Sequence, residues 1–264
     1  MTNADDARLV ASRYSEQAEA YRRHWAPQLF DLGSVLLERL PVSEANAVLE
    51  VGAGVGALLA EIRRRATGAA VVGADIAEGM IRLAPPDIPR VVANAAALPF
   101  RDEGFDVAVM AFMLFHVPEP SDAVREIRRV VRRGGEVGVA TWGPGLNDTP
   151  ADQVWAKVLD ELGAPEETDA VARHDLTDSA EKVAALFATA GFAVAHQEER
   201  VNVDRTDPEE FVKRRTTLGR EHRRLRKLDP NVQAEVVRVG RERLRGLGPD
   251  DFIARETAIL TVLR

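Results

Sequence analysis

Three closely spaced glycines and one acidic residue are the features of this sequence that most directly suggest chemistry. The glycines are Gly52, Gly54 and Gly56. They follow the short apolar run Ala47–Val51, which contains Glu50, and a helical pattern of apolar residues begins at Leu58. A strand, a tight turn and a helix in this order are typical of the first unit of an open α/β sheet. Glycine is needed in such a turn because a Cβ would forbid its φ values and keep a ligand away from the backbone.

The spacing of this turn separates it from a dinucleotide-binding fingerprint. That fingerprint is G-x-G-x-x-G, with the pyrophosphate at the N-terminus of the following helix. Here the third glycine falls one residue early and Ala57 stands in its place. The Glu50 carboxylate would repel a pyrophosphate but would suit a cation. The residues therefore favour a ligand with ammonium and sulfonium groups over NAD.

A second acidic residue follows the next predicted strand. The continuous apolar run Ala69–Ala74 is typical of a strand covered on both faces, and it ends in Asp75. Asp75 lies 19 positions after Gly56, close to the roughly 20 positions at which a carboxylate at a strand's tip accepts ribose hydroxyls. We therefore expect Asp75 to bind the ribose of a nucleoside.

The stretch E-V-G-A-G-V-G at 50–56 resembles the first motif of class I S-adenosylmethionine-dependent methyltransferases, and three later stretches match the same family in order. The resemblance covers 10–142 with specific motifs and the remainder in outline. It implies S-adenosylmethionine as the cofactor and S-adenosylhomocysteine as the product. In these first segments it implies the cofactor-binding residues Glu50, Gly52, Ala53, Gly54, Gly56 and Asp75.

Two further stretches imply the adenine pocket. In DIAEGM, Ile76 and Met80 match the family positions that flank the adenine, although core packing predicts Ile and Met there equally well. Asn94 stands where the family usually has an acid, and its amide can offer the adenine an acceptor and also a donor. Ala95 and the LPF at 98–100 match the family, so the pocket is still expected.

The segment AFMLFHVPEP resembles the family's stretch ending in L-H-H, with Phe115 replacing the first His and His116 keeping the second. The resemblance implies that Ala111 and Phe112 present backbone carbonyls to the methionine ammonium group. His116 is expected at the carboxyl end of the fourth strand, where ligands bind in such sheets. Two roles stay open for it, a general base for the acceptor or a contact that shapes the cofactor pocket.

The N-terminal segment 3–40 is predicted to form two helices broken at Pro27. Tyr14, Ala18 and Tyr21 recur at helical spacing. In the resembling family, a leading helix of the form Y-x-x-x-A-x-x-Y closes over the cofactor, which implies a contact from Tyr21 and, as the second candidate, from Tyr14. An amphipathic helix that only packs on the domain explains the same spacing, and both interpretations can hold together.

The order of elements indicates an α/β fold that is Rossmann-like by resemblance, with a seven-stranded, mostly parallel sheet, helices on both faces and a helical lid. The remaining strands are expected at 91–93, 107–111, 135–142, 192–203 and 256–263, and helices at 121–132, 153–162 and 178–190. The helix at 121–132 is predicted to carry Arg132 and Arg133 at its C-terminus, with Gly134 as its stop. The resemblance implies an antiparallel last strand.

We interpret the chain as a single methyltransferase domain. Its parts are an N-terminal helical cover at 1–40, a cofactor-binding core at 41–142, helical lid insertions at 143–178 and 205–250, and a final strand at 256–264. The lid is expected to offer the acceptor apolar side chains such as Trp142 and Trp155.

A basic run at 213–227 holds eight Lys or Arg against one Glu. Such a run is usually a solvated helix face, and that is the expectation here. Two other roles stay open, an entrance that attracts an acidic substrate and a docking surface for a carrier protein.

Composition narrows the classes of function. The 264-residue chain has a net charge of −7 and a pI near 5.4, which argues against a nucleic-acid partner. It contains no cysteine, and no H-x-H, H-E-x-x-H or carboxylate cluster at metal spacing appears, so no metal is expected. No apolar run approaches the ~18 residues of a membrane span, and the acidic start is unlike a signal peptide, so we expect a cytoplasmic protein.

Together these features predict a methyltransferase for a small, apolar or aromatic acceptor, similar to the small-molecule methylases of ubiquinone, menaquinone and natural-product pathways. The sequence does not distinguish an O, N or C acceptor atom. Three alternatives stay open: a non-methylating enzyme of the same fold that catalyses cyclisation or rearrangement, a cofactor-binding regulatory protein and, as the weakest, a nicotinamide oxidoreductase. A homodimer also stays open.

Overall fold

The computed structural model describes residues 2–144, 149–167 and 173–264. Its α-helices are α1 (Asn3–Glu16), α2 (Ala18–His24), α3 (Ala26–Glu38), α4 (Ala57–Arg65), α5 (Glu78–Ile81), α6 (Pro120–Val130), α7 (Pro150–Glu161), α8 (Ala180–Ala188), α9 (Pro208–Thr217), α10 (Gly219–Arg226) and α11 (Pro230–Leu244). Its strands are β1 (Ala47–Val51), β2 (Ala70–Asp75), β3 (Arg90–Val92), β4 (Phe105–Ala111), β5 (Val131–Trp142), β6 (Val194–Arg205) and β7 (Ile253–Leu263).

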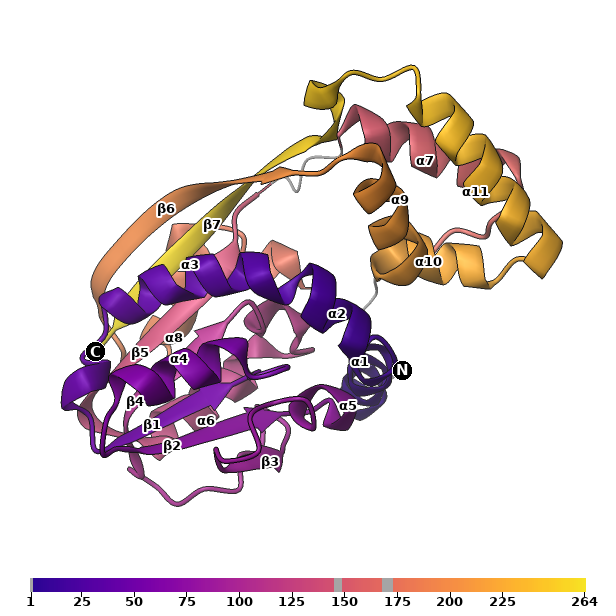
Figure 1. Ribbon diagram of the computed structural model, residues 1–264. Helices are drawn as coiled ribbons and strands as arrows, with labels where there is room; N and C mark the ends of the chain where they lie inside the picture. The colour runs from indigo at the N-terminus through magenta and orange to yellow at the C-terminus, as the bar shows by residue number, and fades with distance from the viewer. Residues whose placement is uncertain (1, 145–148, 168–172) are drawn as a thin grey trace. The chain divides into compact units, whose positions relative to one another are not determined.

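Within these residues, seven strands form one sheet in the order β3-β2-β1-β4-β5-β7-β6 (Figure 1). β1 is parallel to β2 and β4, the pairs β2–β3 and β4–β5 are also parallel, and β7 is antiparallel to β5. The predicted mostly parallel, Rossmann-like sheet with an antiparallel last strand is therefore confirmed. The strand order reverses between β1 and β4, and ligands of open α/β sheets bind at the carboxyl ends of the strands at such a reversal.

Helices cover both faces of the sheet because its central strands carry apolar side chains on both sides. On one face, Leu36 of α3 and Ile62 of α4 pack with Val109 of β4. On the other face, Ile127 of α6 and Phe187 of α8 pack in a second cluster. All five side chains are fully buried. The continuous apolar runs of the sequence therefore became strands buried on both sides, as parallel strands usually are.

The N-terminal segment differs from its prediction. The described residues 2–40 form three helices, and the breaks fall at Gln17 and Trp25 rather than at Pro27. Pro27 lies in the first turn of α3. A proline there loses no helical hydrogen bond, because the first N–H groups of a helix have no partner within it. Proline therefore starts a helix at the position where the sequence pattern suggested a break.

The helix predicted at 121–132 ends two residues early. Val131 begins β5 and pairs with β4 in the sheet. Arg132 and Arg133 consequently lie in a strand, and Gly134 does not stop the helix. The β-branched Val131 suits a strand, and the pairing with β4 is a tertiary contact that a local pattern does not contain.

The chain divides into two compact units, which we describe separately. The first comprises Met1–Pro144, Val171–Arg200 and Thr257–Arg264, and the second comprises Gly145–Ala170 and Val201–Glu256. The second unit has its own core around Trp155, which is fully buried and was wrongly expected to offer an apolar surface to the acceptor. A Cβ on Gly240 would lie 2.5 Å from the Trp155 ring, so close packing of α7 and α11 depends on this glycine. The lid role of 143–178 and 205–250 stays a prediction.

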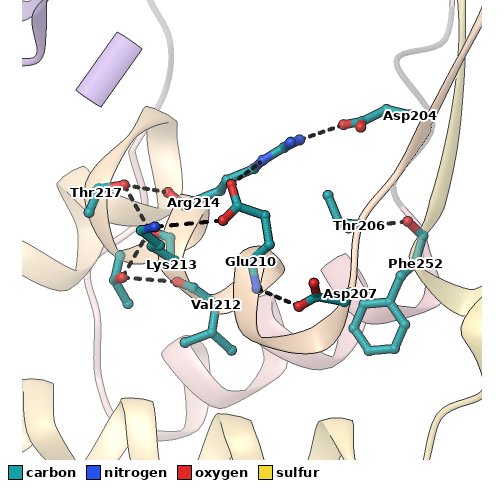
Figure 2. Close-up of polar contacts among 10 residues, drawn as sticks. Asp204, Thr206, Asp207, Glu210, Val212, Lys213, Arg214, Thr217 and Phe252 are labelled. Carbon is teal, nitrogen blue, oxygen red and sulfur yellow. Dashed lines mark hydrogen bonds and ion pairs between the residues drawn. The ribbon is translucent and has the colours of Figure 1, made fainter. Parts of the chain in front are cut away.

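The basic run at 213–227 is partly neutralised by acids within the second unit. Arg214 lies between two of them, with Nη1 2.7 Å from Asp204 and Nε 3.2 Å from Glu210 (Figure 2). Lys213 lies 3.8 Å from the same Glu210. The Arg214–Asp204 pair joins α9 to β6, whereas both pairs with Glu210 lie within α9. Together they leave less free positive charge than the sequence suggests.

Two further arginines of this run pair with α7. Arg215 pairs with Asp152, and Arg224 pairs with Asp160. Arg224 is 2% exposed and also donates to the Pro165 carbonyl at 3.1 Å. The expectation of a solvated face is therefore wrong at Arg224, which is a buried structural cation. The two attractive roles of the run stay predictions.

Candidate functional site

The turn between β1 and α4 depends on three glycines with left-handed backbone. Their φ angles are 73° at Gly52, 54° at Gly54 and 76° at Gly56. A Cβ on Gly52 would lie 2.4 Å from the Met113 Cβ, and one on Gly56 would lie 2.6 Å from the Ala84 Cβ. Conformation and space thus both exclude side chains at these positions. The turn leaves bare backbone at the carboxyl end of β1.

Asp75, at the end of β2, is held by two backbone N–H groups. Gly54 donates to Oδ2 at 2.7 Å, and Ala77 donates to Oδ1 at 2.7 Å. Burial raises the pKa of Asp75, and the two N–H groups oppose that rise. The carboxylate is therefore fixed in orientation while each oxygen keeps a further acceptor position. A pair of neighbouring ribose hydroxyls needs acceptors of this kind.

Glu50 is a buried acid in β1 without a complete set of partners. It is 3% exposed, and within the described chain its Oε2 atom has no hydrogen-bond partner. Burial, and then the neighbouring Asp75, raise its pKa well above the usual value. Burial, Asp75 and Glu50 in turn raise the pKa of the Tyr21 phenol. Because an unpartnered buried carboxyl is costly, this group suits a ligand that brings positive charge or hydrogen-bond donors.

We expect Glu50→Gln to stabilise the ligand-free protein. Since the pKa of Glu50 is raised in the folded state, that state holds the proton more tightly than the unfolded chain does. Stability therefore falls as the pH rises from the usual Glu range towards the raised pKa. At pH 8 the variant should melt on the order of 2–4 °C above the wild type, the shift that about 1 kcal/mol produces in a chain of this size. Near pH 4 the difference should vanish.

Thermal melts across this pH range measure the effect. The exposed Glu44 supplies a matched control, Glu44→Gln, for which we expect no shift. The same Glu50→Gln protein should bind a positively charged ligand more weakly, because the ligand loses its negative partner. A Glu50→Gln protein that melts below the wild type at pH 8 would contradict this reading of Glu50.

A cavity lies at the carboxyl ends of β1, β2 and β4 in the first unit. Its volume is about 740 Å³ with the open mouth included. It is lined by Ala7, Val10, Tyr14, Tyr21, Val51, Gly52, Gly54, Asp75, Ile76, Ala77, Met80, Ala93, Asn94, Ala95, Ala111, Phe112, Met113, His116, Val117 and Pro118. Most of the predicted site residues are thus brought together around one space.

Three predicted site residues do not line this cavity. Ala53 and Gly56 shape the turn: the Ala53 N–H donates to the Ala74 carbonyl at 3.1 Å, and the Gly56 N–H donates to the Ala53 carbonyl at 2.8 Å. Glu50 is the third. Asp75, which lines the cavity, helps to raise the pKa of Glu50, and Glu50 in turn helps to raise the pKa of Tyr21, which also lines the cavity.

The side of the cavity predicted to hold an adenine combines apolar and polar groups. Ile76 and Met80 both line it, and Met80 is also 2% exposed and packs in a small cluster with Ala77. Met80 is therefore a core residue that also forms part of the cavity wall, and its contact with an adenine stays a prediction. Asn94 Oδ1 accepts from the Ala96 N–H at 2.9 Å, which holds the side chain in a turn and leaves its amide nitrogen as a donor.

Phe112, which also lines the cavity, has a strained backbone. Its φ of 53° is in the left-handed region, which is uncommon for a residue with a side chain. The Phe112 N–H donates to the Ala140 carbonyl at 2.8 Å, and its ring centroid lies 4.6 Å from that of Trp142. Ala111 ends β4 immediately before it. Strain of this kind is concentrated at functional sites, where it places backbone groups that regular structure would not.

Tyr14 and His116 form a hydrogen-bonded pair in the cavity wall. The Tyr14 Oη lies 2.6 Å from the His116 Nε2, and the two rings meet edge to face with centroids 5.1 Å apart. Tyr21 lies against Tyr14 with centroids at 5.9 Å. On the other side, Phe115 lies 4.4 Å from the His116 ring. His116, in the segment after β4, is therefore held in place by Tyr14 of α1 and by the neighbouring Phe115 ring.

Several lining residues were missed by the sequence reasoning. Ala7 and Val10 of α1 line the cavity together with Tyr14. The spacing of these three residues places them on one helix face, so the helical pattern contained the signal. Met113, Val117 and Pro118 were also missed. They follow β4 in an irregular segment, where no periodic pattern could have marked them.

The described residues contain no group of three or more His, Asp or Glu side chains that could hold a metal ion. None of the helices in the described part of the chain has both the length and the apolar composition to cross a membrane.

Comparison with known sequences matches residues 49–139 to a family described as Methyltransferase domain. A demethylmenaquinone methyltransferase from Mycolicibacterium vanbaalenii is 34% identical over 125 residues, which cover 47% of this chain and 52% of the relative. The chain spans about half the length of the curated relatives it matches.

Two solved structures share the fold. One is a Bacillus halodurans protein whose name provisionally assigns it as a methyltransferase, with a TM-score of 0.58, 17% identity, and coverage of 88% of this chain and 97% of that one. The other is the [4+2]-cyclase SpnF, with a TM-score of 0.55, 19% identity, and coverage of 89% and 80%. At these identities the likeness concerns the fold alone.

Proposed function

We propose that the chain, whose residues 49–139 match a methyltransferase domain, binds S-adenosylmethionine in the cavity and transfers its methyl group to a small, apolar or aromatic metabolite. The resemblance drawn from the motifs is confirmed by the family match and by the similarity to curated methyltransferases. The cofactor of such a domain is S-adenosylmethionine. The acceptor class and the roles of single residues belong to the proposal.

One observation carries the proposal: a bare glycine turn lies between an unpartnered buried acid, Glu50, and a doubly anchored acid, Asp75. Two acids without a cation would repel a phosphate-rich ligand. They suit a nucleoside that carries an ammonium and a sulfonium group. The Asp75 oxygens would accept the ribose hydroxyls, and Glu50 would balance the positive charge from beneath the turn.

The remaining contacts follow from position in the cavity wall. Ile76 and Met80 would flank the adenine, and Asn94 would bind its polar edge with Ala95 beside it. Ala111 and Phe112 would present backbone carbonyls to the ammonium group, which requires the unusual φ of Phe112 rather than a particular side chain. Tyr21 of α2 would close over the ligand from the N-terminal helices.

The bound cofactor supplies an activated methyl group on a sulfonium. The residues of the chain then have to align an acceptor atom in line with the methyl–sulfur bond and exclude water, and no covalent enzyme intermediate is needed. The apolar part of the wall, including Val10, Met113 and Val117, suits an apolar acceptor. The Mycolicibacterium relative is named for demethylmenaquinone, so hydroquinones are the first acceptors to try.

For a hydroxyl acceptor we assign His116 as the general base and Tyr14 as the residue that positions it. If so, His116→Ala should lower kcat by about 10²- to 10⁴-fold, the usual contribution of a general base, with the S-adenosylmethionine Kd unchanged. Tyr14→Phe keeps the ring but removes the 2.6 Å hydrogen bond, so it should lower kcat less and shift the pH profile of kcat. His196→Ala, at a histidine that pairs with Glu198 instead, is the control.

The measurement is transfer of an isotope-labelled methyl group to a panel of hydroquinones and phenols, with calorimetry for cofactor affinity. Unchanged turnover and weaker cofactor binding in His116→Ala would show that His116 contacts the cofactor and is not a general base. Release of S-adenosylhomocysteine also distinguishes methyl transfer from the cyclisation or rearrangement alternative. The fold shared with SpnF does not favour that alternative, because the two chains are 19% identical.

A further inference from the structure

The edge strand β6 has features of a self-pairing surface. In the strand order β6 is terminal, with β7 on one side (Figure 1). No other strand in the described part of the chain pairs with its second edge. An edge strand of this kind presents a row of N–H and C=O groups that can extend a sheet into another chain. Its side chains then decide which chain fits.

One face of β6 is exposed through four alternate residues, Glu199, Val201, Val203 and Arg205. Val201 is 66% exposed and Val203 is 38% exposed, which makes them two of the few large apolar side chains on the surface of the described residues. Valine favours strands, and two exposed valines flanked by charges of opposite sign form a short, defined pattern.

The charged residues at the ends of this pattern are unused within the chain. Neither Glu199 nor Arg205 has an ion pair with another described residue. The opposite face of the strand differs, because Arg200 lies 3.1 Å from Glu198 and Asp204 lies 2.7 Å from Arg214. The exposed face therefore has free charges of both signs, while the other face is satisfied internally.

We propose that β6 pairs with β6 of a second copy of this chain, antiparallel, about a two-fold axis at Asn202. In that register Glu199 lies opposite Arg205 of the second copy, and Val201 lies opposite Val203 of the second copy. Each contact occurs twice by symmetry, as in every two-fold interface. The two valine pairs form a central apolar patch, and an opposite-charge pair closes it at each end.

The neighbouring registers are disfavoured by charge. In an antiparallel pair, directly opposite residues point to the same side of the sheet, whereas consecutive residues of one strand point to opposite sides. A two-fold axis perpendicular to the sheet must therefore pass through a residue and not between two residues. With the axis at Val201, Glu198 would lie opposite Asp204. With the axis at Val203, Arg205 would lie opposite Val201, and Glu199 would have no partner because β6 ends at Arg205. Like charges directly opposite each other destabilise a strand pair, whereas opposite charges and β-branched pairs stabilise it. Charge complementarity therefore favours a two-fold axis at Asn202 and a second copy of this chain as the partner of β6.

Charge reversal tests the pairing. We expect the wild-type chain to form a reversible dimer of twice 28.9 kDa. Glu199→Arg and Arg205→Glu each place like charges opposite each other at both ends of the interface, so each should raise the dimer dissociation constant by on the order of tenfold or more. The double variant Glu199→Arg/Arg205→Glu restores both pairs with reversed sign and should restore the dimer. Asp87→Arg, at an exposed acid next to β3 at the far end of the strand order, is the control.

A cysteine placed at the centre tests the register, because the native chain contains no cysteine. Asn202→Cys would face itself across the axis with the Cα atoms about 4.5–5.5 Å apart, within disulfide range. Val203→Cys would lie roughly 8 Å from its own copy, from about 3.4 Å of rise per residue and 4.8 Å between strands, and should not cross-link. Both variants introduce the same thiol, at adjacent positions on opposite faces of the strand, so a disulfide at 202 but not at 203 reports the register.

Sedimentation velocity over a range of concentrations, and mild oxidation followed by non-reducing electrophoresis, give the results. Rescue by the double variant together with cross-linking at 202 but not at 203 supports the proposal. A wild-type monomer at all concentrations overturns it, and so does a dimer that the single reversals leave intact. Capture of an unrelated peptide on β6 by a monomeric chain would assign the edge to a different occupant and equally overturn it.

Discussion

Asp75→Asn should lower the affinity for S-adenosylmethionine by on the order of 100-fold. The wild-type carboxylate accepts from the Gly54 and Ala77 N–H groups and keeps acceptor positions for the ribose. Asparagine has one oxygen, so one N–H group would face an amide nitrogen and the ribose would lose a charged acceptor. Losing a hydrogen bond to a charged group costs about 1.5–3 kcal/mol, and about 2.7 kcal/mol corresponds to 100-fold in Kd.

Calorimetric titration measures this change, and a thermal melt of the same protein shows whether the turn stays folded. Asp87→Asn makes the same chemical change at an exposed acid outside the cavity and should leave the Kd unchanged. If Asp75→Asn binds the cofactor as tightly as the wild type, Asp75 does not hold the ribose, and the proposal that the cofactor binds in this cavity is contradicted.

Gly56→Ala should destabilise the protein by about 3 kcal/mol. Its φ of 76° is left-handed, which costs a residue with a Cβ roughly 1–2 kcal/mol. The new Cβ would also lie 2.6 Å from the Ala84 Cβ and 2.7 Å from the Pro85 Cδ. Overpacking of this kind typically adds about 1–3 kcal/mol. The turn would have to shift, and the carboxyl end of β1 with it.

Gly191→Ala separates the two causes. Gly191 has a similar φ of 82°, but no atom lies within 4 Å of a Cβ built there. It should therefore show only the conformational cost of roughly 1–2 kcal/mol. Denaturant unfolding of both variants gives the comparison. Equal losses of stability would mean that the contact with Ala84 relaxes freely and that the turn is less tightly packed than described.

The sheet and the turn could be predicted because their signals are local. Continuous apolar runs such as Ala69–Ala74 mark buried parallel strands, and the glycines of the turn are required by backbone conformation at their own positions. Asp75 follows from its place at the tip of a strand. Each of these inferences depends on only a few adjacent residues, so a single sequence was enough to predict the strands, the turn and Asp75.

The features that sequence reasoning missed depend on contacts between distant segments. The hydrogen bond from Tyr14 to His116 joins α1 to the segment after β4, and no local pattern records it. The early end of α6 follows from the pairing of Val131 with β4. Arg224 looked like one more solvated charge, but Asp160 and the Pro165 carbonyl pair with it in a buried position. In each case tertiary contacts overrode the local preference.

Titration of the wild-type chain with S-adenosylmethionine, and with NADH in parallel, tests the central claim most directly. That claim is that the glycine turn with Glu50 and Asp75 forms a site for a cationic nucleoside. The account predicts heat of binding at one site per chain for S-adenosylmethionine, an affinity on the order of 100-fold weaker in Asp75→Asn, and no binding of NADH. No heat with S-adenosylmethionine, or equal binding of NADH, would contradict it.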